Sequence, residues 1–456
     1  MDKMDKIDKI ETNKVDAVSR REFVKRSSLA LAGGAAVTQF PHVITAHAAP
    51  DDPIRVGLVG CGGRGTGAAL NLLRAKTRVI YPRTGYHTED AASGARVQAQ
   101  NVKIVALADV FKDRLDSCRA QLKKVEMDVP EDQCFVGFDA CKNLLAVPEV
   151  NYVILAGPPQ FRPVHLRAAI EAGKHVFAEK PLAIDGPGVR SVMKSGDIAK
   201  SKGLGIVAGT QRRHQLNYME TVKRLREGAI GEILECRAYW NGGTIWVIER
   251  QPGWTDMEWQ LRNWGYFTWL SGDHIVEQHV HNLDVINWVV GEHPVKAIAL
   301  GGRQARGGRE HGDIYDHFAV EFEYANGMRL FSQCRQMDGT TNLVGEGVLG
   351  TKGTSNCVNR IKTTVEWRYE GKNPDPYEQE HIDLIDSIRA GKPLNEAQSV
   401  AESTMLGIMG RVSAYTGLTV TWDQVLNSKQ DFTPAKWEFG EVAFPEVAIP
   451  GKYKFE

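Results

Sequence analysis

From residue 54 onward, short apolar runs alternate with amphipathic stretches. Runs of strand length lie at 54–59, 102–108, 152–156, 175–178 and 205–208. Stretches with helical periodicity follow at 66–74, 163–172 and 186–202. Strands that alternate with helices predict a parallel, doubly wound sheet, whose ligands bind beyond the carboxyl ends of the strands.

The pattern changes after residue 211, where the expected strands become longer and follow one another. We expect them at 233–239, 297–300, 318–324 and 328–333, with an Asn326-Gly327 turn joining the last two as a hairpin. The chain therefore reads as α/β, with a Rossmann domain at 53–210 and an α+β domain with a mainly antiparallel sheet at 211–456. The division at residue 211 also allows helices near the C-terminal end of the chain to pack against the Rossmann domain.

The first 48 residues read as an export signal. Arg20-Arg21 is followed by Glu22-Phe23-Val24-Lys25, a mildly apolar run at 28–37 and the small-x-small sequence Ala46-His47-Ala48. A charged region, an apolar region and a cleavage site make a secretory signal, and the paired arginines are typical of the twin-arginine pathway. We expect a periplasmic protein.

Composition excludes several classes of partner. The 456 residues carry 56 basic and 56 acidic side chains, so nothing points to nucleic acid. No apolar run reaches the roughly 20 residues of a membrane span. The seven cysteines form no CxxC pair, so neither a zinc site nor a redox pair is expected.

A glycine-rich turn joins the first strand to the first helix. It reads G-x-G-x-x-G, and we expect its residues to bind a dinucleotide: Gly60, Gly62, Gly63, Arg64 and Gly65. In this motif the first glycine permits a tight turn, the second lets the backbone approach the pyrophosphate, and the third lets the helix pack on the strand. The pyrophosphate then lies at the helix N-terminus, where free N–H groups favour anions.

The acid that ends the next strand predicts which dinucleotide binds. Asp109 follows the strand at 102–108, where a carboxylate would bind ribose hydroxyls and repel a 2′-phosphate. We therefore expect NAD, with NADP less favoured. Residues 76–100 read as an inserted loop that lengthens the usual spacing.

Glu179-Lys180-Pro181 directly follows the strand at 175–178. Together with the glycine turn, it resembles the Gfo/Idh/MocA oxidoreductases over roughly residues 53–450. The resemblance implies an open, mainly antiparallel second sheet, hydride transfer between NAD(P) and a sugar or cyclitol, and a homo-oligomer, either dimer or tetramer. It implies a catalytic role for Lys180, a cis bond before Pro181, and cofactor contacts from Pro158, Glu179 and Lys180.

A helix expected after residue 272 carries the second part of the resemblance. His281-x-x-Asp284 matches the family's histidine motif, with Glu277 where aspartate is usual and His279 where glycine is common. Because Glu277 and His281 are four residues apart, we expect one helical face, with Glu277 orienting His281 as a general base. A metal held by Glu277 and His281 is a lesser alternative, because no third ligand is evident.

Weaker predictions concern the substrate. Arg212, in Gln211-Arg212-Arg213, resembles a family segment and is expected to contact cofactor or substrate, whereas a structural salt bridge is an equal alternative for Arg213. His279 and Asp284 are further candidates for substrate contacts. Six of the ten tryptophans lie at 240–269, and we expect one or two to face a sugar ring.

Three functions remain open at this stage. The first is an NAD-dependent oxidoreductase acting on the CH–OH group of a sugar, glycoside or cyclitol. Because free NAD is scarce outside the cytoplasm, its cofactor would be tightly bound. The second is a redox-neutral glycoside hydrolase that uses NAD transiently, and the third is a non-catalytic sugar-binding protein.

Overall fold

The computed structural model describes residues 52–79 and 89–456. The predicted export signal at 1–48 lies outside the described residues, as does much of the predicted insertion at 76–100. What is described of that insertion includes β2 (Thr77–Val79) and β3 (Glu89–Ala91), which pair antiparallel.

A six-stranded sheet forms the first half of the fold. The parallel sheet and five of its strands were predicted, whereas the strand at 134–136 was not. Its strand order is β5-β4-β1-β6-β7-β8, and all its strands are parallel. Its strands are β1 (Ile54–Val59), β4 (Val102–Asp109), β5 (Cys134–Val136), β6 (Tyr152–Leu155), β7 (His175–Ala178) and β8 (Ile206–Ala208). The order reverses beside β1, and the carboxyl ends of β1, β4 and β6 therefore frame a crevice of the kind where such sheets bind ligands.

Helices alternate with these strands. They are α2 (Gly63–Leu72), α3 (Lys112–Lys123), α4 (Ala140–Leu145), α5 (Arg162–Glu171) and α6 (Gly186–Lys202). Helix α6 has the predicted bounds, capped by Asp185 and ended by Gly203 in the left-handed conformation. Helix α2 begins three residues earlier than predicted, inside the glycine motif.

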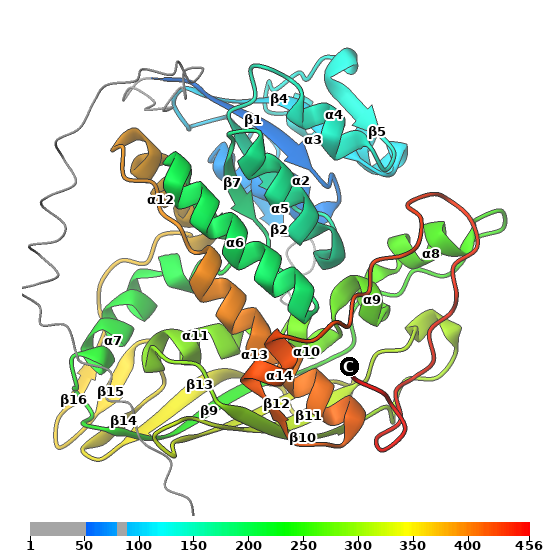
Figure 1. Ribbon diagram of the computed structural model, residues 1–456. Helices are drawn as coiled ribbons and strands as arrows, with labels where there is room; N and C mark the ends of the chain where they lie inside the picture. Colours follow the sequence, from blue (N-terminus) through cyan, green and yellow to red (C-terminus); the bar gives the residue numbers. More distant parts are fainter. Residues whose placement is uncertain (1–51, 80–88) are drawn as a thin grey trace, which may run out of the picture. The chain divides into compact units, whose positions relative to one another are not determined.

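The second half contains a nine-stranded sheet (Figure 1). Its order is β16-β15-β14-β13-β9-β12-β11-β10-β17, and its described pairs are antiparallel except for β9 with β12. Its strands are β9 (Ile233–Gly242), β10 (Lys296–Gly302), β11 (His317–Glu323), β12 (Arg329–Gln336), β13 (Leu343–Gly350), β14 (Gly353–Ser355), β15 (Arg360–Lys362), β16 (Glu366–Arg368) and β17 (Val420–Thr421). The Asn326-Gly327 turn joins β11 to β12, with Gly327 at φ +85°, and confirms the predicted hairpin.

Helices of the second half pack against both sheets. They are α7 (Leu216–Arg226), α8 (Asp256–Arg262), α9 (Thr268–Ser271), α10 (His274–Glu277), α11 (Val280–Val290), α12 (Pro376–Arg389), α13 (Ala397–Thr416) and α14 (Trp422–Leu426). Helix α12 returns to the first sheet, where Leu384, Ile385 and Ile388 join the core around α2 and β1. In the described part of the chain, no helix combines the length and apolar character that crossing a bilayer requires.

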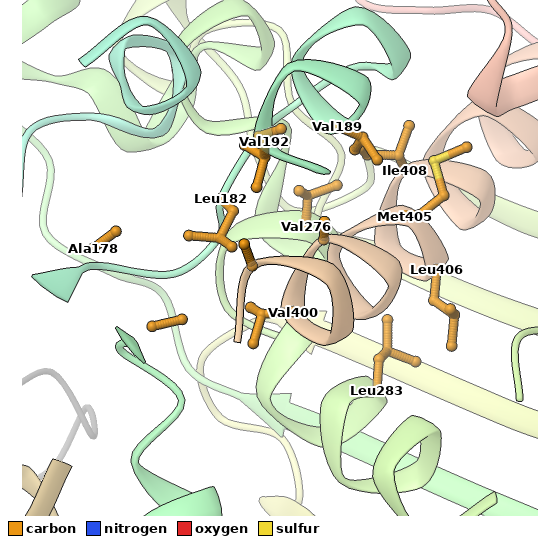
Figure 2. Close-up of a cluster of buried hydrophobic side chains, with 14 of the residues drawn as sticks. Ala178, Leu182, Val189, Val192, Val276, Leu283, Val400, Met405, Leu406 and Ile408 are labelled. Carbon is orange, nitrogen blue, oxygen red and sulfur yellow. The ribbon is translucent and has the colours of Figure 1, made fainter. Parts of the chain in front are cut away.

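Helix α13 joins the two halves through one apolar core. Figure 2 shows Val400, Met405, Leu406 and Ile408 of this helix among side chains of α6, α10 and α11. A Cβ atom on Gly407 would lie 3.0 Å from the Cα atom of Val276, so α10 approaches α13 closely here. Because Val276 directly precedes Glu277, this packing fixes the backbone that carries the site described next.

Candidate active site

A cleft of about 630 Å³ lies at the carboxyl ends of β1, β4, β6 and β7. Its volume lies within the usual range for small-molecule and cofactor sites. The first half of the chain lines one side, and parts of 244–281 together with Tyr377 complete the lining. Both halves therefore contribute to one site.

The glycine turn is shaped as the motif predicts. Gly60 has φ +92°, and a Cβ atom there would lie 2.5 Å from the backbone nitrogen of Gly157. A Cβ atom on Gly65 would overlap the carbonyl oxygen of Gly60, whereas one on Gly62 would meet nothing within 4 Å. Gly62 and Gly63 line the cleft where α2 begins. These features fit a pyrophosphate approaching the N-terminus of α2.

Asp109 lies beside the same turn. One carboxylate oxygen accepts a hydrogen bond from the backbone nitrogen of Cys61 (2.6 Å), and the other accepts one from Phe111 (2.8 Å). Burial raises the pKa of Asp109. The carboxylate lines the cleft where an adenosine ribose would lie, while it also ties β4 to the glycine turn.

Arg64 links the glycine turn to two other elements. Its Nε atom donates to Glu179 at 2.6 Å, and its guanidinium lies 3.4 Å from the carboxylate of Glu380 on α12. Burial raises the pKa of Glu380 well above its usual value. Arg64, Glu179 and Pro158 all line the cleft. The predicted cofactor residues are thus brought together, with Arg64 and Glu179 also engaged with each other.

Lys180 follows β7 at the inner end of the cleft. The Lys180–Pro181 bond is cis, which confirms the prediction. The ammonium donates to a carboxylate oxygen and to the backbone carbonyl oxygen of Glu277, both at 2.6 Å. Both side chains are mostly buried, with 14% and 15% exposed, yet both line the cleft. The ammonium is therefore held in one position while it remains accessible to a ligand.

The predicted continuous helix around His281 is wrong. Helix α10 ends at Glu277 and α11 begins at Val280. The Glu277 carboxylate accepts a hydrogen bond from Lys180. The predicted contact by which Glu277 would orient His281 is therefore replaced by a contact with Lys180. Asp273, at φ +72°, caps α10. Its carboxylate accepts hydrogen bonds from the hydroxyl of Tyr415 and from the backbone nitrogen of Tyr315. These contacts hold the short helix in a direction that local periodicity does not encode.

His281 lies near the start of α11 and lines the cleft with Lys180. Its ring stacks on Trp240 with centroids 5.8 Å apart and planes 24° apart. Burial, and then the charges of Lys180 and Arg212, hold the pKa of His281 well below its usual value. The imidazole is therefore neutral near pH 7, the form in which one ring nitrogen carries a free lone pair.

Three predicted substrate contacts lie in other surroundings. Arg212 pairs with the buried Glu346 at 2.5 Å, and Asp284 accepts a bidentate contact from Arg213. His279 is fully buried, with its Nε2 atom 2.7 Å from the hydroxyl of Ser332. None of Arg212, His279 and Asp284 is among the residues that line the described cleft. Contacts of His279 and Asp284 with substrate, and of Arg212 with cofactor or substrate, therefore stay predictions.

The same contacts bear on two further alternatives, a structural salt bridge for Arg213 and a metal near His281. The Arg213–Asp284 pair is the structural salt bridge offered for Arg213. Glu277 pairs with Lys180, and His279 contacts Ser332, so the polar side chains here point to different partners. Within residues 52–79 and 89–456, no group of three or more His, Cys, Asp or Glu has an arrangement suited to a metal ion.

Sequence reasoning missed several residues that line the cleft. Arg162, His165 and Tyr377 do so and were not predicted. Trp246 and Trp264 also line the cleft, which makes them the candidates for the predicted contact of one or two tryptophans with a sugar ring. Arg162 donates to the carbonyl oxygens of Gly157 and Pro181, on either side of the inner end of the cleft. The ring of Tyr377 lies 5.0 Å from the Arg64 guanidinium. No local motif marks these positions, because long-range folding brings them to the cleft.

The glycine turn, the Rossmann sheet and the Lys180–His281 pair define a nucleotide-binding oxidoreductase fold. The NAD-binding Rossmann model of the Gfo/Idh/MocA oxidoreductases matches residues 54–210, and the C-terminal domain model of the same family matches residues 218–355. The two models together cover more than half of the chain, which belongs to the Gfo/Idh/MocA family.

Two curated relatives illustrate the range of the family. The chain is 28% identical to inositol 2-dehydrogenase of Agrobacterium fabrum, over 58% of this chain and 70% of that protein. It is 29% identical to 2,7-anhydro-N-acetylneuraminate hydratase of Escherichia coli, over 43% of this chain and 48% of that protein. The chain thus spans about half the length of the hydratase.

Solved structures share the fold. Levoglucosan dehydrogenase, in complex with NADH and levoglucosan, superposes with a TM-score of 0.61 and 17% identity, covering 81% of this chain and 99% of that one. At this identity the similarity establishes the arrangement of the two sheets and their helices. It confirms the predicted α/β class with a mainly antiparallel second sheet.

Proposed function

We propose that this protein is an NAD-dependent oxidoreductase acting on the CH–OH group of a sugar, glycoside or cyclitol. The observation that carries the proposal is that Lys180 and His281, from different halves of the chain, line the cleft onto which the glycine turn opens. The inositol dehydrogenase relative and the NADH complex of the structural neighbour support it. Asp109 supports NAD over NADP.

The residues divide the chemistry between them. The neutral His281 accepts the proton of the substrate hydroxyl as general base. The Lys180 ammonium, fixed by Glu277, donates a hydrogen bond to the same oxygen and stabilises its developing negative charge. The bound nicotinamide would supply the acceptor for the hydride that leaves the substrate carbon. Arg162, in the cleft lining, joins the segments that precede α5 and follow Lys180 by donating to the carbonyl oxygens of Gly157 and Pro181.

The decisive assay offers sugars, cyclitols and aryl glycosides to the purified protein while nicotinamide absorbance and aglycone release are followed. A ketone product, with or without an added carbonyl acceptor, supports the oxidoreductase. Aglycone release without net cofactor reduction supports the redox-neutral alternative, which the hydratase relative favours. Sugar binding with no turnover would support the third alternative, a non-catalytic sugar-binding protein.

The pH dependence of oxidation is a test of His281. Because the pKa of His281 is held well below its usual value, the basic form persists as pH falls through that value, and kcat/KM is expected to stay level there. Below the folded pKa the imidazole is protonated and activity is lost. We expect His281→Gln to lower kcat/KM by about 10²- to 10⁴-fold and to remove this acid limb. If the loss of kcat/KM at low pH were unchanged in the variant, it would arise from the titration of a group other than His281.

We also propose that the protein is exported by the twin-arginine route to the periplasm and forms a homo-oligomer. The sequence at 19–48 supports export. The outer face of the second sheet carries three exposed apolar side chains, Ile298, Leu300 and Phe331, which suits a subunit contact. Light scattering of the purified protein and fractionation of an Arg20→Lys/Arg21→Lys variant test the two proposals.

A further inference from the structure

The adenosine end of the cleft is walled by the second half of the chain. Phe111 and Arg114, just after Asp109, line this end on the Rossmann side. Leu261 and Arg262, at the end of α8, line it from the opposite side. An adenosine seated beside Asp109 would therefore lie between α3 and α8.

Arg262 fastens α8 to α3. Its two terminal nitrogens each lie 3.0 Å from an oxygen of Asp113, in the first turn of α3. Its Nε atom donates to Glu258 at 3.0 Å, so the guanidinium is held from both sides. The Nη2 atom of Arg114 donates to the Arg262 carbonyl oxygen at 3.3 Å. Bidentate arginine–carboxylate contacts are geometrically specific. The Arg262–Asp113 ion pair that joins α8 to α3 is called the latch below.

Aromatic rings enclose the same guanidinium. Its central carbon lies 3.9 Å from the ring centroid of Phe111 and 4.8 Å from that of Trp254, and only 15% of the side chain is exposed. Phe111 belongs to the cleft wall, whereas Trp254 belongs to the segment before α8. The latch therefore combines ion pairing with cation–π contacts across the two halves.

The C-terminal tail supports this wall from outside. Trp437 packs on Phe161 with centroids 4.5 Å apart, and Phe439 packs on Phe138 and Phe111 at 5.2 and 5.9 Å. These three phenylalanines line the cleft. The backbone nitrogen of Met257 in α8 donates to the Gly440 carbonyl oxygen. Figure 1 shows the tail, in red, running past α9 and α8.

We propose that α8 and residues 431–444, together named the adenosine clamp, hold the adenosine diphosphate half of NAD(H) and retain it through turnover. This inference rests on the proposed function. Release of the adenosine requires α8 to separate from α3, so the Arg262–Asp113 latch must open first. The observed dissociation rate is then the rate of the open form multiplied by the fraction of time that the latch is open. Retention suits an exported enzyme. The hydride taken from the CH–OH carbon of one substrate would then pass to the carbonyl carbon of an acceptor while the cofactor stays bound.

Dissociation of NADH from the holoenzyme tests the clamp. NADH fluorescence is followed after addition of excess ADP-ribose, for the parent protein, Asp113→Asn and Arg262→Ala. Asp113→Asn removes the ion pair from an exposed carboxylate without altering the core, and we expect about a tenfold faster dissociation, with a larger effect for Arg262→Ala. Arg368→Ala, which breaks an exposed pair with Glu366 far along the chain, is the matched control and should leave the rate unchanged.

A second ligand separates the clamp from general damage to the cleft. Nicotinamide mononucleotide lacks the adenosine half, so its affinity should be the same in the parent and in Asp113→Asn. NADH that binds but leaves at the same rate in both latch variants would overturn the clamp alone. A folded parent protein that binds no NADH would overturn the proposed function and the clamp with it.

Discussion

Lys180→Met is expected to lower kcat for CH–OH oxidation by about 10³-fold while NADH binding persists. Methionine retains most of the side-chain length but removes the ammonium that stabilises the developing alkoxide, and loss of one such donor costs about 10²- to 10³-fold. The ammonium of Lys180 also forms an ion pair with Glu277, so the variant loses that ion pair together with the charge. Single-turnover oxidation in the holoenzyme, with NADH fluorescence as the binding control, measures the effect.

The variant leaves a mostly buried carboxylate without its cation. The double variant Lys180→Met/Glu277→Gln removes that unpaired charge and should recover stability but not turnover. Lys296→Met is the matched control, because Lys296 pairs with Glu323 at 2.9 Å on the second sheet, away from the cleft. Turnover of Lys180→Met within a few-fold of the parent would remove Lys180 from the chemistry.

Local patterns predicted the parallel sheet of the Rossmann half and three of its helices, but not β5, α3 or α4. The apolar run at 175–178 and the helical stretch at 186–202 coincide with β7 and α6, because a buried parallel strand and a capped amphipathic helix have strong local signals. The glycine turn was equally predictable, since Gly60 and Gly65 occupy positions where a Cβ atom would meet backbone. The end of β7 then placed Lys180 at the cleft.

The surroundings of Lys180 could not be predicted in this way. A spacing of four residues predicted that Glu277 faces His281, but α10 ends between them. The break depends on long-range contacts of Asp273 with Tyr315 and Tyr415, and on the close approach of α10 to Gly407. Such contacts have no local signature, so tertiary structure overrode helical periodicity.

The predicted substrate residues lie outside the lining of the described cleft for a related reason. Arg212, His279 and Asp284 are polar residues beside the catalytic motifs, which favoured a place in the cleft. Their partners Glu346, Ser332 and Arg213 are between 53 and 134 positions away in the chain. Polar side chains near a motif can therefore form the buried support beneath a site, and only their partners distinguish the two roles.

Asp284→Asn is expected to lower the free energy of unfolding by about 3–5 kcal/mol, which is the usual cost of removing one partner from a buried ion pair. Only 1% of the Asp284 side chain and 11% of that of Arg213 are exposed, so the guanidinium would lose its counter-charge in a poorly hydrated place. The substrate KM of the folded fraction should not change, because Asp284 is not among the residues lining the described cleft. Urea denaturation measures the stability, and steady-state kinetics at low temperature measures KM.

Asp116→Asn provides the comparison for this variant. Asp116 pairs with Lys112 across one turn of α3 while half of its side chain is exposed, and such pairs contribute about 0.3–0.5 kcal/mol. A similarly small loss in Asp284→Asn, together with a raised KM, would return Asp284 to the substrate site. A large loss at constant KM would instead establish that the Arg213–Asp284 pair supports α11, and with it His281, from below the cleft.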